Sequence, residues 1–285
     1  NNPLRQPISI QQNAIIVGMQ YFIPVVVFLF GTVLGSFLNV VIFRHNSGRT
    51  FGGRSGCMTC ARNLQWYELV PIFSYVFIGG KCRKCKTPIS FLYPIVEFVM
   101  GLILLFIFAR FAFFLPFAIG NFFYYAAFYT LAFSIMMVIA GYDLRHKIVP
   151  NNLVYPLMAV AFVGLFLSDY GSFHFHAATL MSIAAGPIVA LPLFLLWAVS
   201  KGEWLGFGDV KLAVAIGLLL GIARGFAALM LGFWAGAIVG IIILLLHGKH
   251  ASRKMQIPFA PFLVLGTLIA FFYDVTVTSL LTFFR

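Results

Sequence analysis

The chain has 285 residues, of which 62% are hydrophobic, 17% aromatic and only 9% charged, and its mean hydropathy is +1.00. Because a soluble domain carries roughly 25% charged residues, this composition excludes an ordinary cytosolic enzyme, a disordered chain and a secreted disulfide scaffold. The formal net charge of +12 arises from 19 basic and 7 acidic residues. Such an excess is also found in nucleic-acid-binding proteins, so the positions of the charges decide what it means.

Seven apolar stretches are long enough, or nearly so, to cross a bilayer, which takes about 20 residues of helix. In chain order they are 14–43, 91–109, 122–139, 153–167, 177–199, 210–246 and 257–272. The stretch 210–246 contains Arg224, so we divide it into a short helix, 210–223, and a full one. The sequence therefore predicts an all-α polytopic membrane protein with about eight transmembrane helices.

The basic residues separate by side of the membrane. With eight spans, fifteen of the 19 Lys and Arg lie in the loops on one side, and the other four lie opposite. The fifteen lie in residues 44–90, 142–152, 200–211 and 247–256. The positive-inside rule makes these loops cytoplasmic and places residues 1–13 outside. The charge excess thus reflects topology and argues against a nucleic-acid partner, while contact with anionic membrane lipid at the inner leaflet fits it.

All four cysteines lie in the 44–90 loop, as two Cys-x-x-Cys pairs. They are Cys57, Cys60, Cys82 and Cys85. Two residues between cysteines let one tight turn direct both sulfurs at a metal, and two such pairs complete a tetrahedral zinc site with no open position. Disulfides are disfavoured in the cytosol, and c-type haem attachment needs a His where this chain has Ala61 and Lys86. We therefore expect a structural zinc ion that staples the cytoplasmic loop.

Two aspartates lie at the cytoplasmic boundary of the predicted spans: Asp143 at the end of one and Asp209 at the start of another. Carboxylates at the edge of the hydrocarbon are costly and indicate function. Gly206 and Gly208 precede Asp209, and they permit positive φ and the close approach of another backbone, such as an extended substrate. The alternatives are an ion pair of Asp143 with Arg145 or Lys147, and a helix-dipole role for Asp209.

Two carboxylates that share a site hold one proton between them. The ionised member then takes a proton from water while the protonated member polarises a carbonyl, which is amide hydrolysis without a covalent intermediate. Serine and zinc proteolysis lack support, because the chain has no Gly-x-Ser-x-Gly and no His-Glu-x-x-His motif. The residues thus favour an aspartyl protease, with a proton-coupled transporter as the alternative of another class.

The motifs, in their order along the chain, closely resemble those of the type IV prepilin peptidases, which are bifunctional leader peptidases and N-methyltransferases of bacterial inner membranes. The matching segments are 35–44, 54–60, 66–71, 81–85, 88–90, 93–97, 141–151, 206–211 and 257–262. This resemblance implies that Asp143 and Asp209 cleave the basic leader of a prepilin or pseudopilin at the cytoplasmic face. The substrates would serve a type IV pilus, a type II secretion system or a competence system.

The resemblance also implies transfer of a methyl group from S-adenosylmethionine to the new N-terminal residue. No Gly-x-Gly-x-x-Gly motif for a dinucleotide is present, so the methyl-donor site would be built from the cysteine loop and adjacent helix ends. Glu68 and Glu97 are the candidate contacts. The domains implied are a first transmembrane helix (14–43), a methyltransferase-associated zinc loop (44–90) and an aspartyl peptidase bundle (91–285). A leader peptidase that lacks methylation is the nearest alternative.

The chain departs from the family pattern at two informative positions. Asn151 stands where the family often has Asp, so the catalytic acid of that segment must be Asp143. Met58 follows the first cysteine where Pro is usual. We also expect Pro258 and Pro261 to break the start of the last helix, which would leave backbone groups free to hold an unwound leader peptide.

Overall fold

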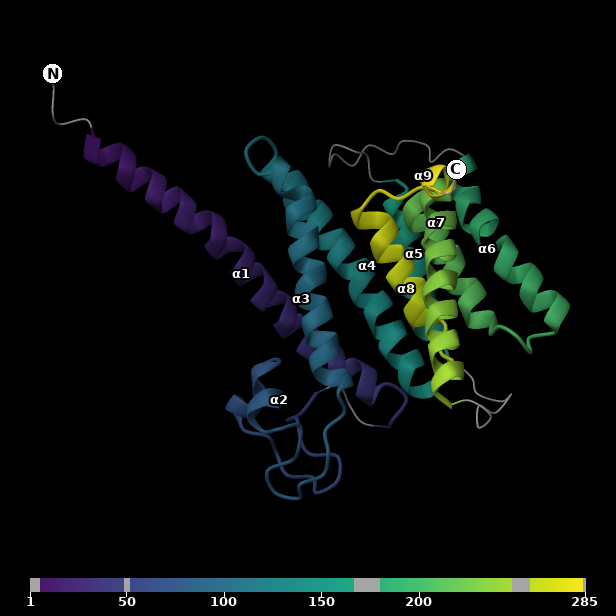
Figure 1. Ribbon diagram of the computed structural model, residues 1–285, viewed down its shortest axis with the longest axis horizontal. Coiled ribbons are helices and arrows are strands. Elements are labelled where there is room, and N and C mark those ends of the chain that lie inside the picture. Colours follow the sequence, from purple (N-terminus) through teal and green to yellow (C-terminus); the bar gives the residue numbers. More distant parts are fainter. Residues whose placement is uncertain (1–5, 49–51, 167–179, 248–256, 284–285) are drawn as a thin grey trace. The chain divides into compact units, whose positions relative to one another are not determined.

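The computed structural model describes residues 6–48, 52–166, 180–247 and 257–283, and it describes side chains from residue 22 onward, except at His247 and Phe283. The chain divides into two compact units. Unit 1 comprises Asn1–Val40 and Thr50–Ala112, and unit 2 comprises Val41–Arg49 and Phe113–Arg285. The predicted all-α architecture is confirmed, since the regular elements of the described residues are helices (Figure 1).

Unit 1 holds two long helices and the cysteine loop between them. These elements are α1 (Gln6–Arg44), the short turns η1 (Trp66–Glu68) and α2 (Phe73–Phe77), and α3 (Leu92–Phe111). Only the last residues of α1 belong to unit 2. Helix α3 thus belongs to the same unit as the cysteine loop.

Glycines bring α1 and α3 together. A Cβ at Gly35 would lie 2.7 Å from the Cα of Glu97, and a Cβ at Gly31 would lie 2.7 Å from the Cα of Gly101. Small residues permit this close backbone approach inside a membrane, where helices associate by packing because the lipid tails are as apolar as leucine. Substitution of either glycine would force the helices of unit 1 apart.

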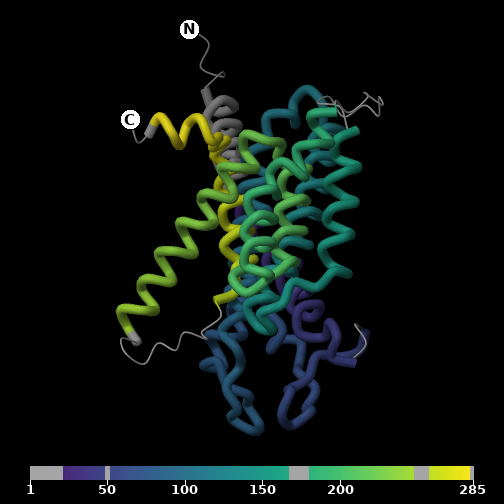
Figure 2. Tube along the Cα trace, turned by 90° about the vertical axis from the view of Figure 1, so that its right-hand side faces the viewer, coloured from purple at the N-terminus to yellow at the C-terminus, as the bar shows by residue number. Residues whose placement is uncertain are grey.

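Unit 2 is a helical bundle whose helices run side by side (Figure 2). Its helices are α4 (Ile119–His146), α5 (Asn151–Gly164), α6 (Leu180–Ser200), α7 (Phe207–His247), α8 (Ala260–Phe272) and α9 (Val277–Phe283). Helix α7 packs against α5, α6 and α8, and α4 packs against α5 and α8. The starts of α5, α7 and α8 and the end of α4 carry the motifs singled out above.

Five helical segments of the described residues are long and apolar enough to cross a membrane: Phe22–Arg44, Leu92–Phe114, Ile119–His146, Leu180–Ser200 and Phe207–Leu246. Two shorter apolar helices, Asn151–Gly164 and Ala260–Phe272, accompany them. Helix α7 is interrupted at Gly221, whose φ of 78° is not helical. The described residues thus hold five long apolar helical segments, one of them kinked at Gly221, and two shorter ones.

The predicted boundaries shift in two places. The division of 210–246 occurs at Gly221 rather than at Arg224, because glycine adopts a positive φ at no steric cost. The last helix begins at Ala260, so the predicted start at residue 257 is early. Pro258 precedes that helix and Pro261 lies in its first turn, where proline is tolerated because the N–H has no helical partner there. Parts of the predicted spans 153–167 and 177–199 lie outside the described residues.

Candidate functional site

The two Cys-x-x-Cys segments of unit 1 have the same backbone conformation. The Cys57 N–H donates to the Arg62 carbonyl, and the Ala61 N–H donates to the Cys57 carbonyl. Twenty-five residues later the corresponding bonds join Cys82 to Thr87 and Lys86 to Cys82. The residues after the second cysteines, Ala61 and Lys86, both have a positive φ, 53° and 60°. Each segment is therefore one tight knuckle, and Met58 in place of proline does not change its form.

The knuckles bring their sulfurs together, as predicted. All four Sγ atoms lie within 4.8 Å of one another, with Cys57 3.6 Å from Cys85 and Cys60 4.0 Å from Cys82. Because a Zn–S bond is about 2.3 Å long, the sulfurs of a tetrahedral four-thiolate site stand about 3.8 Å apart. The donor set and its spacing fit a structural zinc ion, which would cross-link the two knuckles.

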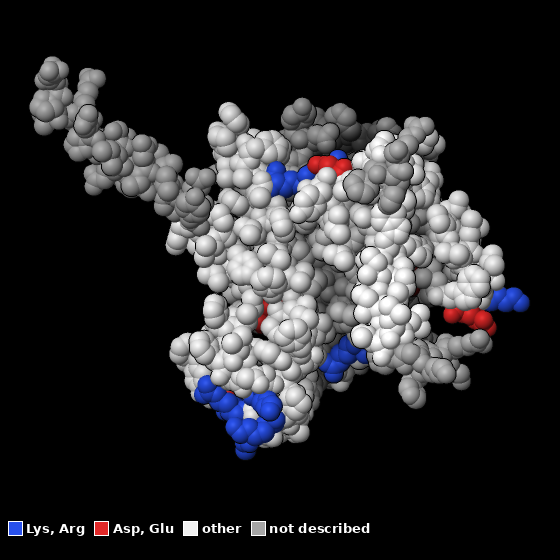
Figure 3. Space-filling model, viewed as in Figure 1, with Lys and Arg blue, Asp and Glu red and all other residues white. Residues whose placement is uncertain are grey.

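The surroundings of the thiols are electropositive. Exposed basic side chains border the knuckles, and Figure 3 shows Lys and Arg gathered on this loop; those flanking the cysteines are Arg54, Lys81, Arg83, Lys84 and Lys86. Hydrogen bonds with the Thr87 side chain and backbone lower the pKa of Cys85 to about 6. The backbone N–H groups of Cys60 and Thr59 lower the pKa of Cys57. Both effects favour the thiolate, which is the form that binds metal. A backbone bond at Arg62 lowers the pKa of Cys60, but burial and the neighbouring thiols outweigh it and raise that pKa to about 11.

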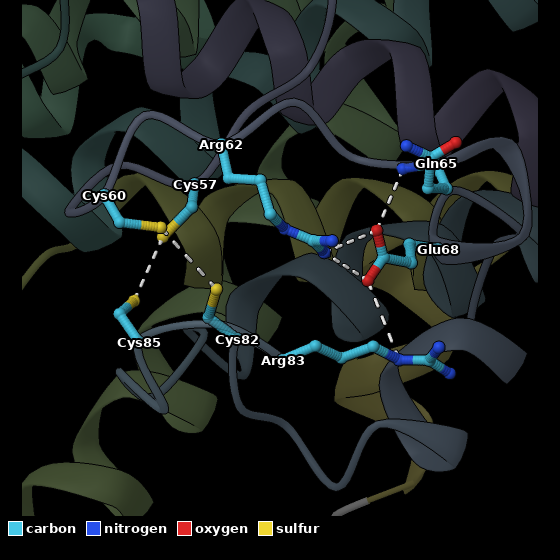
Figure 4. A network of polar contacts seen from close by, with 8 residues as sticks. All are labelled: Cys57, Cys60, Arg62, Gln65, Glu68, Cys82, Arg83 and Cys85. Carbon is cyan, nitrogen blue, oxygen red and sulfur yellow. Dashed lines mark hydrogen bonds and ion pairs between the residues drawn. The ribbon is translucent and has the colours of Figure 1, made fainter.

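Glu68 holds the loop together from the side opposite the sulfurs (Figure 4). Its carboxylate is 6% exposed and accepts two bonds from the Arg62 guanidinium, at 2.5 and 2.7 Å, and one from the Gln65 N–H at 2.9 Å. Arg83 approaches it at 3.7 Å. Burial raises the pKa of the Glu68 carboxyl, but the Gln65 and Arg62 bonds outweigh it and hold that pKa below its usual value. Glu68, which lies in η1, therefore links η1 to the first knuckle through Arg62 and to the second through Arg83.

Glu97 lies in α3 and is also buried, at 7% exposure. It accepts the Ile72 N–H at 2.7 Å, and the Ser36 and Asn39 side chains bond to it. Asn39 donates its amide to the Tyr93 carbonyl at 3.0 Å, which leaves its buried Oδ1 without a donor. The partners of the Glu97 carboxylate are neutral, whereas Glu68 is bonded by arginine. The neighbouring Asn39 Oδ1 is a second acceptor, and no donor bonds to it. The arrangement suits a cationic group.

In unit 2, Asp143 lies in the last turn of α4 and is 4% exposed. Its Oδ2 accepts the Ala260 N–H at the start of α8, at 3.1 Å. The alternative ion pairs are not formed: the Arg145 guanidinium lies 4.4 Å over the Phe43 ring, and Lys147 caps the helix through its backbone N–H. The carboxylate is thus turned inward and held by backbone.

Asp209 lies in the first turn of α7 and is 7% exposed. Its Oδ1 is buried and has no hydrogen-bond partner. Gly208, the residue before Asp209, lies against Val149 of the α4–α5 connection, and Asp143 is within electrostatic range of Asp209, so these carboxyl groups, 66 residues apart in sequence, lie in one region of unit 2. Among the described residues no cation pairs with either of them. Two buried carboxyl groups without a cation are the arrangement that shares one proton.

The two glycines before Asp209 differ in role. A Cβ at Gly208 would lie 2.6 Å from the Cβ of Val149. The backbone that approaches Gly208 closely is therefore the α4–α5 connection of this chain and not a substrate. Gly206 is exposed, and the nearest atom to a Cβ there would be Asp209 Oδ2 at 3.6 Å. Neither glycine uses the positive φ that it permits. Gly208 lets α7 start against Val149, and Gly206 leaves open space next to Asp209.

Sequence reasoning missed Lys211, two residues after Asp209. Its Nζ donates to Asn151 Oδ1 at 2.8 Å and to the Tyr155 hydroxyl at 3.2 Å, and it lies 5.0 Å from the centre of the Phe207 ring. Lys211 thereby joins the first turns of α5 and α7. The signal was present in the sequence, since a lysine at the membrane edge requires partners, but only the fold shows that Asn151 is one of them.

Two family models match the chain. The model of the bacterial peptidase A24 N-terminal domain matches residues 29–111, and that of the type IV leader peptidase family matches residues 130–245. The chain is 30% identical to the prepilin leader peptidase/N-methyltransferase of Legionella pneumophila over 92% of this chain and 95% of that protein. It is 31% identical to the protein of that name from Bacillus subtilis (strain 168), over 89% of this chain and 96% of the relative. No solved structure gives a significant match.

Proposed function

The chain belongs to the type IV leader peptidase family, and from that premise we propose that it is a membrane aspartyl endopeptidase that also N-methylates its product. Its substrates are type IV prepilins or pseudopilins, and cleavage removes their leader. The observation that carries the proposal is the approach of two buried carboxyl groups without a cation, Asp143 and Asp209.

In the proposed cleavage step the two aspartates hold one proton. The ionised one takes a proton from the attacking water, and the protonated one donates a hydrogen bond to the scissile carbonyl. The backbone at the start of α8 holds the Asp143 carboxyl through the N–H groups of Ala260 and Phe259. Asp209 offers its unpartnered Oδ1. The two carboxyl groups titrate as a coupled pair, so the base role and the acid role belong to the pair and not to one named aspartate.

We place the reaction at the cytoplasmic face of a bacterial inner membrane. The basis is the charge distribution, since fifteen of the 19 basic residues lie in loops on the side of Asp143 and Asp209. Gly206 offers space for the extended leader beside Asp209. Residues 257–259, which precede α8 and are not helical, are the further candidate for holding the leader.

The methyl-transfer step is assigned to unit 1, where zinc would hold Cys57, Cys60, Cys82 and Cys85 and fix the shape of the loop. S-adenosylmethionine supplies the methyl group and carries two cationic groups, a sulfonium and an ammonium. Glu97 and the unpartnered Asn39 Oδ1 are acceptors that suit such a cation, or the amine that becomes methylated. Glu68 stays a candidate contact, although its two oxygens already bond Arg62 and Gln65.

The test uses purified protein in detergent, a prepilin-like peptide and labelled S-adenosylmethionine. Asp143→Asn and Asp209→Asn each remove cleavage while zinc content and thermal stability stay unchanged. Asp274→Asn is the matched control, because this carboxylate of unit 2 pairs with Arg224 at 2.9 Å and is far along the chain from both motifs. Retained cleavage in either aspartate variant contradicts the proposal. Methyl transfer to a peptide that already lacks its leader separates the bifunctional enzyme from a peptidase without methylation.

A further inference from the structure

The cysteine loop contains an apolar segment that zinc binding does not require. Residues 69–80 include no charged side chain, and eight of these twelve residues are hydrophobic. An apolar run of roughly 10–14 residues is too short to span a bilayer and is typical of a buried core helix or of an interfacial segment. The structure distinguishes these two alternatives.

The segment is not a buried core. Its short helix α2 exposes Phe73, Val76 and Phe77, at 55%, 69% and 81% of their surface. Positions i, i+3 and i+4 lie on one face of a helix, so these three side chains form one continuous apolar face. Tyr75 is directed the other way, toward the protein, where its hydroxyl bonds the Ile89 carbonyl.

The segment is fixed at the edge of the membrane. Helix α3 has 20 residues, which at 1.5 Å per residue match the roughly 30 Å of hydrocarbon. Glu97 lies five residues into α3 and accepts the Ile72 N–H at 2.7 Å. Ile72 adopts a φ of 62° to make this bond, which is a strained conformation for a β-branched residue. The backbone of the segment is therefore held level with the first two turns of a membrane span.

We propose that residues 69–80 form a membrane-binding element, which inserts Phe73, Val76 and Phe77 into the boundary between headgroups and acyl chains. Phe91, which precedes α3, and Ile95 and Phe98 within α3 are also exposed, and the Tyr75 and Phe91 ring centroids lie 6.0 Å apart. Basic residues follow within six positions, namely Lys81, Arg83, Lys84 and Lys86, and they complement anionic headgroups. The zinc loop is then anchored to the bilayer surface.

Lipid is the occupant that these observations favour. An exposed apolar face with lysines nearby is typical of interfacial binding. Unit 2, a second copy of the chain and the apolar segment of a substrate are the other possible occupants. The experiment below separates them.

A depth-dependent quenching experiment tests the proposal. The four native tryptophans, Trp66, Trp197, Trp204 and Trp234, are replaced by Phe, and one reporter is introduced per protein. Phe77→Trp is the test, Phe98→Trp on α3 is the positive control, and Met58→Trp, exposed on a knuckle, is the negative control. In vesicles that contain phosphatidylcholine dibrominated at carbons 6 and 7, the reporter at 77 loses at least half as much fluorescence as the one at 98. Quenching no greater than at 58 overturns the proposal.

A second measurement keeps the native tryptophans. A benzophenone amino acid is placed at position 77 of the full chain and irradiated in vesicles of phosphatidylethanolamine and phosphatidylglycerol. The expected product is a lipid adduct seen by mass spectrometry, which the same amino acid at position 58 does not form. A crosslink to unit 2, to a second chain or to an added prepilin, without a lipid adduct, contradicts the proposal. Unchanged cleavage and zinc content show that the labelled protein is folded.

Discussion

The buried carboxylates of the two units differ in what surrounds them. In unit 1, Glu68 is paired with Arg62 and hydrogen-bonded to the backbone of η1, so its charge is compensated within the loop. In unit 2, Asp143 and Asp209 are bonded only by backbone groups, those of Ala260 and Phe259 for Asp143 and that of Gly206 for Asp209, and no cation among the described residues pairs with either. Burial of a charge costs free energy unless it is paired. A compensated carboxylate holds structure, whereas an uncompensated pair is available for proton transfer.

Of the substitutions in unit 1, loss of a zinc ligand should reduce loop stability and methyl transfer the most. Cys82→Ser removes one of four thiolates, and because zinc binding is coupled to folding of such a loop, the metal is lost and the loop unfolds. Methyl transfer falls to background, while cleavage is reduced less than by Asp209→Asn. Zinc content, loop proteolysis and the two activities are measured together. Met58→Ser, on the first knuckle, is the control and keeps its zinc; equal loss of both activities would remove the functional distinction between the units.

Glu68→Gln tests whether the ion pair is structural. The substitution leaves the Arg62 guanidinium without its partner and lowers the stability of the loop by about 1–3 kcal/mol, while cleavage changes less than twofold. Because the folded pKa of Glu68 is lowered, its contribution is present above the unfolded pKa and is lost as the pH falls through the folded pKa. Loop stability of wild type and variant should therefore converge on acidification, as followed by proteolysis. A difference that grows toward low pH contradicts this assignment.

Lys211→Met tests positioning in unit 2. It removes the bonds to Asn151 and Tyr155 and loosens the joint between α5 and α7, so Asp209 is held less firmly. We expect cleavage to fall about tenfold, in line with the cost of misplacing a catalytic group. Lys201→Met is the control, since that lysine is exposed in the α6–α7 connection. An equal loss of cleavage in both variants would contradict this role, because it would assign the effect to removal of a positive charge rather than to the bonds that Lys211 makes.

Replacement of Pro258 and Pro261 by Ala is expected to have the smallest effect. If residues 257–259 join α8, the non-helical segment before the helix is lost, and the Michaelis constant for the prepilin peptide rises a few-fold with zinc content unchanged. The backbone groups of Ala260 and Phe259 already bond Asp143, so only the backbone groups before them are available to the leader. An unchanged Michaelis constant removes the leader-holding role of this segment.

The sequence was sufficient for local features and for those set by composition. The helical segments and the two cysteine knuckles follow from hydropathy and spacing, because each depends on residues near in sequence. The bonds that distinguish the carboxylates do not: Glu97 meets Ile72, Asp143 meets Ala260 and Lys211 meets Asn151 only through the fold. Gly206 and Gly208 do not use the positive φ that glycine permits, because Gly208 is needed for contact with Val149 rather than for a turn. Contacts between residues 25 to 117 positions apart produce no periodic pattern in the sequence from which they could be predicted.

The joint action of Asp143 and Asp209 is tested most directly by a double-mutant cycle. The value of kcat/KM for a prepilin-like peptide is measured for wild type, Asp143→Asn, Asp209→Asn and the double variant. Residues that act as a unit are strongly non-additive. Each single variant should lose at least about a thousandfold, and the double variant should be no slower than either. Multiplicative losses, or a single variant with near wild-type cleavage, would contradict a shared catalytic site.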